Sequence, residues 1–185
     1  NNNAYCQDNA ISWTDWSMTP EKQDFLEFTR RVIAIWKAYP VLRRRKFFQG
    51  RRIRGAEVQD IAWLEPSGAE MTDDMWSSPE VRALAVRLNG DAIQDVNERG
   101  ERIVSDTLLL MLNAGAEPVT FELPATAPIE RWETLVDTAD PWQASRRLRA
   151  GDRYALPPHS MAALKLNNRK EDLRRAADWG PQGVL

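Results

Sequence analysis

Apolar side chains first form a regular pattern between residues 19 and 39. They recur at intervals of three and four, which places them along one face of an α-helix. Thr19 is a suitable N-cap, Pro20 fits the first helical position, and Pro40 cannot continue the helix. A stripe this wide must pack against something large. Its members are Phe25, Phe28, Val32, Trp36 and Tyr39, with Leu26, Ile33 and Ile35 beside them.

Beyond Pro40 the period of the apolar pattern changes to two, which is typical of β-strands. Residues 72–76 are an exception, because Thr72 precedes two acids there and predicts a short helical turn. Short strands at this spacing, with no long helices between them, predict an antiparallel β-sandwich. The expected strands are residues 61–64, 84–88, 107–112, 119–123, 132–136, 154–156 and 160–166.

The charge of the chain is high but nearly balanced. Its 185 residues include 25 Lys and Arg against 27 Asp and Glu, a formal net charge of −2. A dedicated binder of nucleic acid or of an anionic membrane carries a strong basic excess, so this balance argues against both partners. A basic cluster at residues 43–46 and 51–52 is interpreted as a solvated helix end and turn, because acidic residues dilute it on both sides.

Cysteine usage and hydropathy bear on the compartment. Cys6 is the only cysteine, which excludes an intrachain disulfide and favours a reducing environment. No signal-peptide pattern appears, and no apolar run is long enough to cross a bilayer. We therefore expect a cytoplasmic protein without a membrane partner.

Few residues offer chemistry of their own. His159 is the only histidine; it follows two prolines at a turn, and nothing marks a partner for it. Clusters of Cys and His that would hold a metal are excluded by count, and no phosphate-cradling glycine motif appears. We expect neither a metal nor a cofactor.

The first sixteen residues are too polar and irregular for a helix or strand, yet they are rich in Asn, Tyr and Trp, as a sugar-facing loop would be. Asp8 and Asp15 share this loop. Glycoside hydrolysis needs two carboxylates about 5 to 10 Å apart, so the pair is a candidate. The alternative is that both acids cap or orient the loop. The chain opens on this loop without an initiator Met, and we expect a fragment of something larger.

Several stretches are longer than a spaced-residue motif. They are residues 1–9 (NNNAYCQDN), 12–16 (SWTDW), 43–50 (RRRKFFQG), 60–63 (DIAW), 70–76 (EMTDDMW), 88–91 (LNGD) and 135–139 (LVDTA). In these stretches the chain resembles the C-terminal part of bacterial glycogen debranching enzymes. These are the isoamylase-type members of the α-amylase superfamily, glycoside hydrolase family 13. The resemblance extends over at least residues 1–166.

The resemblance implies hydrolysis of α-1,6-glucosidic branch linkages in glycogen or its limit dextrin, by a retaining mechanism. It places the Asp nucleophile, the Glu acid/base and a second Asp upstream of Asn1. No catalytic residue is therefore expected here, and the isolated chain is expected to be inactive. The implied fold is mainly β: residues 1–45 as the last loop and helix of a truncated (β/α)8 barrel, 46–166 as an antiparallel C-terminal β-sandwich, and 167–185 as a charged, flexible tail.

By the same resemblance the opening loop borders the substrate cleft, because the active sites of such barrels lie at the face built from the loops after the strands. Side chains there could hydrogen-bond sugar hydroxyls or hold the shape of the loop. The residues concerned are Asn2, Asn3, Tyr5, Gln7 and Asp8. The implied partners are a branched α-glucan and the catalytic barrel of the same protein.

A stand-alone carbohydrate-binding or structural β-sandwich module is the alternative hypothesis. The chain has eight tryptophans, a side chain that serves apolar cores and sugar-stacking platforms alike. Core packing or contact between domains is the competing explanation for them. The candidates for a stacking platform are Trp13, Trp16, Trp63, Trp76, Trp132 and Trp142.

Overall fold

The computed structural model describes residues 5–50, 59–125 and 131–167. The chain divides into two compact units, Asn1–Ala34 and Ile35–Leu185. The charged tail expected at residues 167–185 lies outside the described residues, apart from Asn167 at the end of the last strand. The expected domain boundary between residues 45 and 46 stays a prediction.

Helix α1 (Pro20–Ala38) forms where the apolar stripe predicts it. Thr19 caps its first turn, since the backbone N–H of Lys22 donates to Thr19 Oγ1 at 3.4 Å and that of Gln23 donates to Thr19 O at 3.0 Å. Among the described residues, no α1 side chain is buried, and Phe25 is 70% exposed. Most apolar side chains of the helix are therefore exposed or half-buried. A short 3₁₀ turn, η1 (Pro40–Arg43), follows it.

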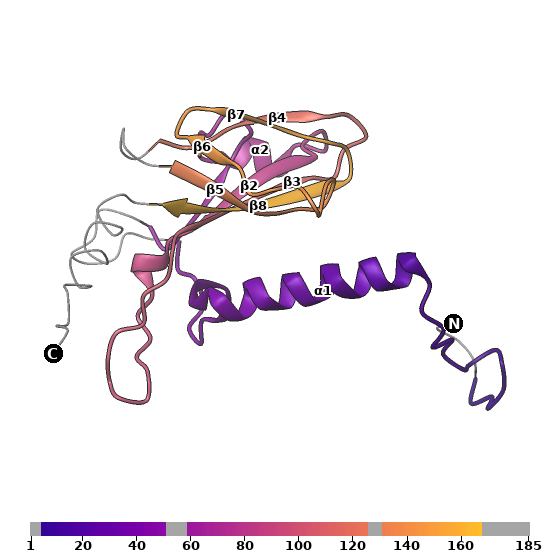
Figure 1. Cartoon of the computed structure of the whole chain (residues 1–185). Coiled ribbons are helices and arrows are strands. Elements are labelled where there is room, and N and C mark those ends of the chain that lie inside the picture. The colour runs from indigo at the N-terminus through magenta and orange to yellow at the C-terminus, as the bar shows by residue number, and fades with distance from the viewer. Residues whose placement is uncertain (1–4, 51–58, 126–130, 168–185) are drawn as a thin grey trace, which may run out of the picture. The chain divides into compact units, whose positions relative to one another are not determined.

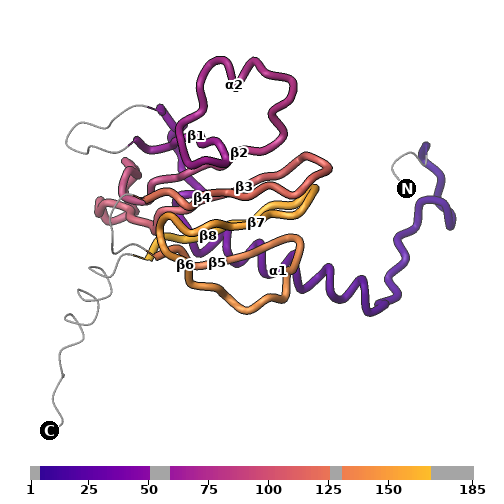
Figure 2. The backbone as a smooth tube through the Cα atoms, turned by 90° about the horizontal axis from the view of Figure 1, so that it is seen from above, coloured from indigo at the N-terminus to yellow at the C-terminus, as the bar shows by residue number. Residues whose placement is uncertain are grey.

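The described strands form a six-stranded and a two-stranded sheet, and every strand pairing in them is antiparallel. The larger sheet has the order β1-β2-β3-β8-β5-β6, and the smaller one pairs β4 with β7. Figures 1 and 2 show the smaller sheet lying over one face of the larger. The strands are β1 (Ile61–Leu64), β2 (Ala83–Leu88), β3 (Leu108–Asn113), β4 (Val119–Glu122), β5 (Arg131–Asp137), β6 (Arg147–Arg149), β7 (Arg153–Leu156) and β8 (Ser160–Asn167).

The predicted antiparallel sandwich is thus confirmed, and the seven expected strands form within one or two residues of their predicted bounds. The expected helical turn is α2 (Asp73–Ser77), capped by Thr72. A second 3₁₀ turn, η2 (Gly90–Ala92), follows β2 and is capped by Asn89. Strand β6 was not predicted. It has only three residues, two of them exposed arginines, so it carries no alternating apolar pattern.

Apolar clusters cover both faces of the larger sheet. Strand β3 contributes Leu109 and Met111 to the cluster between the two sheets, and Leu108 to the cluster on the outer face. This explains why β3 is apolar at nearly every position, as a central strand is. The cluster between the sheets comprises Leu64, Ala85, Leu109, Met111, Phe121, Leu123, Trp132, Tyr154, Leu156, Ala162, Leu164 and Leu166.

A β-bulge in β5 changes which side chains face the smaller sheet. The register shifts between Thr134 and Val136, so that Asp137 lies opposite Ala162, a residue of the cluster between the sheets. There Tyr154 Oη donates a hydrogen bond to the buried Asp137 carboxylate. Burial, together with this bond and the negative charge of Asp137, raises the pKa of Tyr154. The bulge thus gives a polar pair a place inside an apolar core.

A buried ion pair ties the segment after η1 to the start of β1. Arg44 Nη1 lies 3.1 Å from Asp60 Oδ2, and their side chains are 4% and 2% exposed. The backbone N–H groups of Gln49 and Gly50 also donate to the Asp60 carboxylate, each at 3.0 Å. Burial alone would raise the pKa of Asp60, but these hydrogen bonds and the Arg44 charge outweigh it and lower the pKa. The interpretation of residues 43–46 as a solvated cluster is therefore wrong for Arg44, because its partner lies 16 residues away in the sequence.

Candidate functional site

The opening loop is a defined turn built around Asn9. The backbone N–H groups of Ser12 and Trp13 donate to Asn9 O at 2.9 and 3.0 Å, and that of Ile11 donates to Asn9 Oδ1 at 3.0 Å. Tyr5 adopts a positive φ of 45°, a conformation that non-glycine residues rarely take outside tight turns. Local hydrogen bonds, not regular secondary structure, therefore fix the loop.

Both candidate carboxylates of this region are engaged with neighbouring residues. Asp8 Oδ1 accepts a hydrogen bond from Trp13 Nε1 at 2.7 Å. Asp15 accepts from Lys22 Nζ at 2.6 Å and from the backbone N–H of Ser17 at 2.9 Å. The Lys22 hydrogen bond is the main cause that lowers the pKa of Asp15, so this carboxylate stays ionised. The geometry is that of acids that orient the loop and the start of α1.

The proposed sugar-contacting residues lie partly within the described chain. Tyr5, Gln7 and Asp8 are exposed, while Asn2 and Asn3 lie outside the described residues. The backbone oxygen of Gln7 accepts a hydrogen bond from Ser12 Oγ. This bond fixes the backbone at Gln7, from which the exposed Gln7 side chain extends. Their role in binding sugar stays a prediction.

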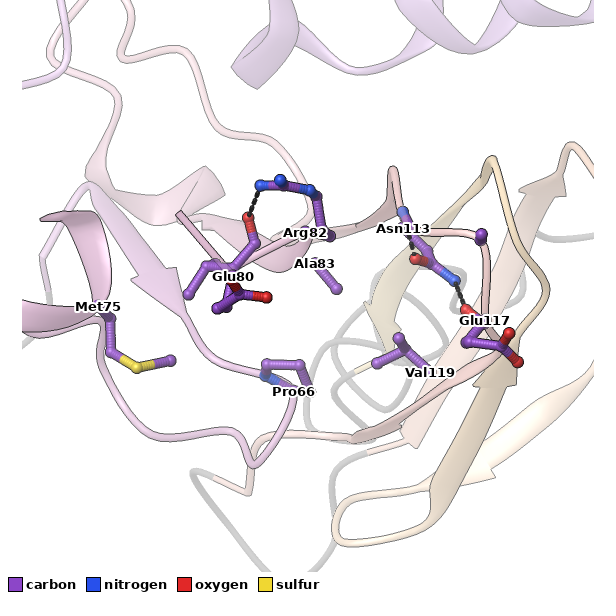
Figure 3. Close-up of a pocket in the computed structure, with 11 residues that line it drawn as sticks. Pro66, Met75, Glu80, Arg82, Ala83, Asn113, Glu117 and Val119 are labelled. Atoms are coloured by element: carbon purple, nitrogen blue, oxygen red, sulfur yellow. Dashed lines mark hydrogen bonds between the residues drawn. The ribbon is translucent and has the colours of Figure 1, made fainter. Parts of the chain in front are cut away.

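The sandwich has a pocket of its own at the end of the sheets where β2 and β4 begin. Its volume is about 380 Å³, within the range of small-molecule sites. Figure 3 shows the apolar side chains of Pro66, Met75 and Val119 lining it, with Glu80 and Glu117 on different sides. Its wall thus mixes apolar surface with carboxylates.

Asn113 holds one wall of this pocket together. Its Nδ2 donates to Glu117 O at 2.8 Å and to Leu156 O at 3.2 Å, and its Oδ1 accepts from the backbone N–H of Gly115 at 3.0 Å. On the other wall Arg82 Nη1 donates to Pro79 O. Sequence reasoning missed this pocket, because isolated acids before strands look like ordinary turn residues. The Asn113 amide at the end of an apolar strand was the one local signal.

Two exposed tryptophans of the sandwich contact one another. The ring centroids of Trp63 on β1 and Trp76 on α2 lie 5.5 Å apart, with the ring planes at 78°. Their exposed fractions are 42% and 51%, whereas Trp132 is 1% exposed and donates its Nε1–H to Pro124 O at 3.1 Å. The core explanation for the tryptophans therefore holds for Trp132 and not for Trp63 or Trp76.

The structure also describes the surroundings of His159 and the possible metal and membrane sites. His159 adopts a φ of 50° in the turn before β8, and its backbone N–H donates to Gly115 O at 3.2 Å. Within residues 5–50, 59–125 and 131–167, no group of three or more His, Cys, Asp or Glu side chains is placed to hold a metal ion. No helix in the same ranges is long and apolar enough to cross a membrane.

Comparison with known families identifies the sandwich. The family described as isoamylase, C-terminal, matches residues 60–156, which begin at the buried Asp60 and end with β7. The matched span contains the Trp63–Trp76 pair, the residues that line the pocket, and most of the core between the two sheets, apart from the residues of β8.

Relatives extend the similarity toward the N-terminus. A glycogen operon protein GlgX homolog of Mycobacterium tuberculosis is 43% identical over 167 residues, which cover 89% of this chain and 23% of the relative. An isoamylase of Pseudomonas amyloderamosa is 31% identical over 140 residues, which cover 76% of this chain and 16% of that protein. The chain thus spans less than a quarter of the length of these relatives.

One similar solved structure is pullulanase type I from Bacillus subtilis in complex with maltose. The TM-score is 0.48 at 16% sequence identity, and the match covers 83% of this chain and 17% of that one.

Proposed function

Since the chain belongs to the isoamylase C-terminal domain family, we propose that it is the C-terminal portion of a glycogen debranching enzyme. The proposed reaction is hydrolysis of α-1,6-glucosidic branch linkages in glycogen or limit dextrin. The observation that carries the proposal is the 43% identity to a glycogen operon protein over 89% of this chain. The substrate would be a branched α-glucan, and the partner would be the catalytic barrel of the same polypeptide.

In this proposal the described residues help to position the substrate and to support the catalytic barrel, and they supply no catalytic carboxylate. Asp8 and Asp15 hydrogen-bond to Trp13 and Lys22, which leaves them to fix the opening loop. A loop fixed in this way can present Tyr5 and Gln7 to a sugar at the border of a cleft. The apolar face of α1 would pack against barrel strands, which gives its exposed side chains a partner.

A hydrolysis assay on branched glucan tests the proposal. The 185-residue chain should release no reducing ends from glycogen limit dextrin, whereas a longer protein that also carries the barrel should release linear chains. In the longer protein, Tyr5→Ala should raise KM more than it lowers kcat, because Tyr5 is assigned to binding. Turnover by the chain alone would show that it holds catalytic groups of its own and would refute this assignment.

A stand-alone carbohydrate-binding or structural sandwich is the second candidate. The exposed Trp63–Trp76 pair favours it, because a module that only binds needs such a surface and no barrel. The size of the native polypeptide separates the two candidates. Immunodetection with an antibody to the sandwich should find a protein several times larger than 21.2 kDa in cells that make it. A band at the smaller mass would favour the stand-alone module.

A further inference from the structure

The Trp63–Trp76 pair is a built surface feature that the proposed hydrolysis does not use. The two rings contact one another at 5.5 Å and remain 42% and 51% exposed. Trp142 is similarly exposed, at 55%, yet it has no aromatic neighbour among the described residues. The pair therefore differs from an isolated surface tryptophan because each indole ring packs against the other.

Hydrogen bonds fix the backbone that carries both indoles. Trp63 lies inside β1, where it pairs with Val86 of β2, and its carbonyl accepts the N–H of Met71 at 2.9 Å. Trp76 lies in α2, whose Thr72 cap accepts from the N–H of Met75 at 3.3 Å and from that of Trp76 at 3.0 Å. Because both side chains come from hydrogen-bonded elements, a ligand would pay little ordering entropy to use them.

The surroundings of the pair are amphipathic. In the described part of the chain neither indole N–H has a hydrogen-bond acceptor, whereas those of Trp13 and Trp132 each have one. The pair therefore offers two free N–H donors beside its apolar rings. Exposed carboxylates of Asp73 and Asp74 on α2 add acceptors. Apolar faces next to free donors and acceptors suit a ligand that alternates C–H faces with hydroxyl groups, as a sugar does.

We propose that Trp63 and Trp76 form a binding site for a linear α-1,4-glucan segment on the sandwich, an inference that rests on the proposed glucan-acting function. The angle between the rings supports the linkage type. The 78° between the ring planes makes a corner and not a flat platform. Successive units of an α-1,4-linked chain turn relative to one another, whereas a β-1,4-linked chain is flat and extended, so the corner fits the coiling chain.

Such a site would hold the polymer at a second point, apart from the reacting branch. A glucan that is bound at two points on one protein presents its branch at a raised effective concentration. The site should therefore matter for long outer chains and be dispensable for a short branched oligosaccharide that cannot reach both points.

Titration of the ¹⁵N-labelled 185-residue chain with maltoheptaose tests the proposal directly. The indole N–H signals of Trp63 and Trp76 should shift saturably, and that of Trp142 should stay unchanged. Trp76→Ala should weaken binding by about tenfold, which is the scale of one lost aromatic contact, while Trp76→Phe should lose less. Trp142→Ala is the matched control, and cellohexaose should bind at least several-fold more weakly than maltoheptaose.

The absence of saturable shifts at Trp63 and Trp76 would overturn the proposal, as would equal losses from Trp76→Ala and Trp142→Ala. Equal binding of cellohexaose would overturn the assignment to α-glucan. In the barrel-containing protein, Trp76→Ala should raise KM for glycogen and leave turnover of a short branched oligosaccharide unchanged. Absence of these indole shifts in that protein would indicate that another domain covers the pair and would also overturn the site. Failure of that protein to hydrolyse any branched glucan would instead refute the proposed function.

Discussion

Replacing the buried Asp60 with Ala should strongly destabilise the sandwich. Asp60 accepts hydrogen bonds from Arg44 Nη1 at 3.1 Å and from the backbone N–H groups of Gln49 and Gly50 at 3.0 Å each. The substitution removes all three acceptor contacts and leaves the guanidinium of Arg44, whose side chain is 4% exposed, without its counter-charge.

The structure sets the expected magnitude. Breaking a buried pair by removing one partner costs about 3–5 kcal/mol, because an uncompensated charge stays buried. Gln49 and Gly50 are exposed residues, so water can replace the lost carboxylate at their N–H groups and adds little to this cost. For a protein of this length about 4 kcal/mol corresponds to a melting temperature lower by about 10–15 °C.

Thermal unfolding followed by circular dichroism measures this loss. Asp91→Ala removes an exposed carboxylate and should change the stability by less than about 0.5 kcal/mol. The double variant Arg44→Met with Asp60→Leu should be more stable than Asp60→Ala, because it buries no unpaired charge. The claim that the pair is buried and coupled would be refuted by an Asp60→Ala protein within about 1 kcal/mol of the parent, or by a double variant no more stable than Asp60→Ala.

The same carboxylate predicts how acid affects stability. The pKa of Asp60 is lower in the folded chain than its ordinary value of about 3.9. Its contribution is therefore complete above that value and is lost as the pH falls through the lower folded pKa. Asp60→Asn should flatten the decline of the melting temperature below about pH 4, and an unchanged acid limb would contradict this reasoning.

Three further predictions concern close packing, the core pair and the helix. Gly90→Ala should lower the free energy of unfolding by about 3 kcal/mol or more, since a Cβ there would lie 1.8 Å from a backbone oxygen. Gly151→Ala, at a φ of 82° in open space, should lower it by only about 1–2 kcal/mol. Urea unfolding compares the two variants. Tyr154→Phe should destabilise the sandwich by about 1–3 kcal/mol because the buried Asp137 loses a donor, and an unchanged urea midpoint would count against that hydrogen bond. The 185-residue chain should self-associate through the apolar face of α1, and Phe25→Lys should reduce that association in sedimentation velocity; clean monomer at high concentration would contradict this.

Local patterns were enough to locate most elements. Helix α1 follows from an apolar stripe between Thr19 and Pro40, and the strands follow from alternation and turn residues. These signals depend only on the direction of side chains along a helix or strand, so an element can be located without knowing which other elements it packs against. Strand β6 was not predicted from the sequence, because it forms by pairing with β5 and has no apolar alternation of its own.

The opening loop shows the limit of composition as evidence. Its Asn, Tyr and Trp content predicted a sugar-facing loop, and Tyr5, Gln7 and Asp8 are exposed, while their contact with sugar stays a prediction. Composition could not say that Asp8 binds Trp13, since that bond depends on the turn made by Asn9. Their proposed contact with sugar still depends on a catalytic barrel that the described residues do not contain.

The sequence by itself determined the element types, the antiparallel class of the sandwich and, through its long motifs, the family. Tertiary structure decided which charged and aromatic residues act together. Arg44 meets Asp60, a bulge turns Asp137 toward Tyr154, and Trp63 meets Trp76. The physical reason is that periodicity is a property of neighbours along the chain, whereas burial of a charge or contact of two indoles depends on strand register and packing between segments far apart in sequence.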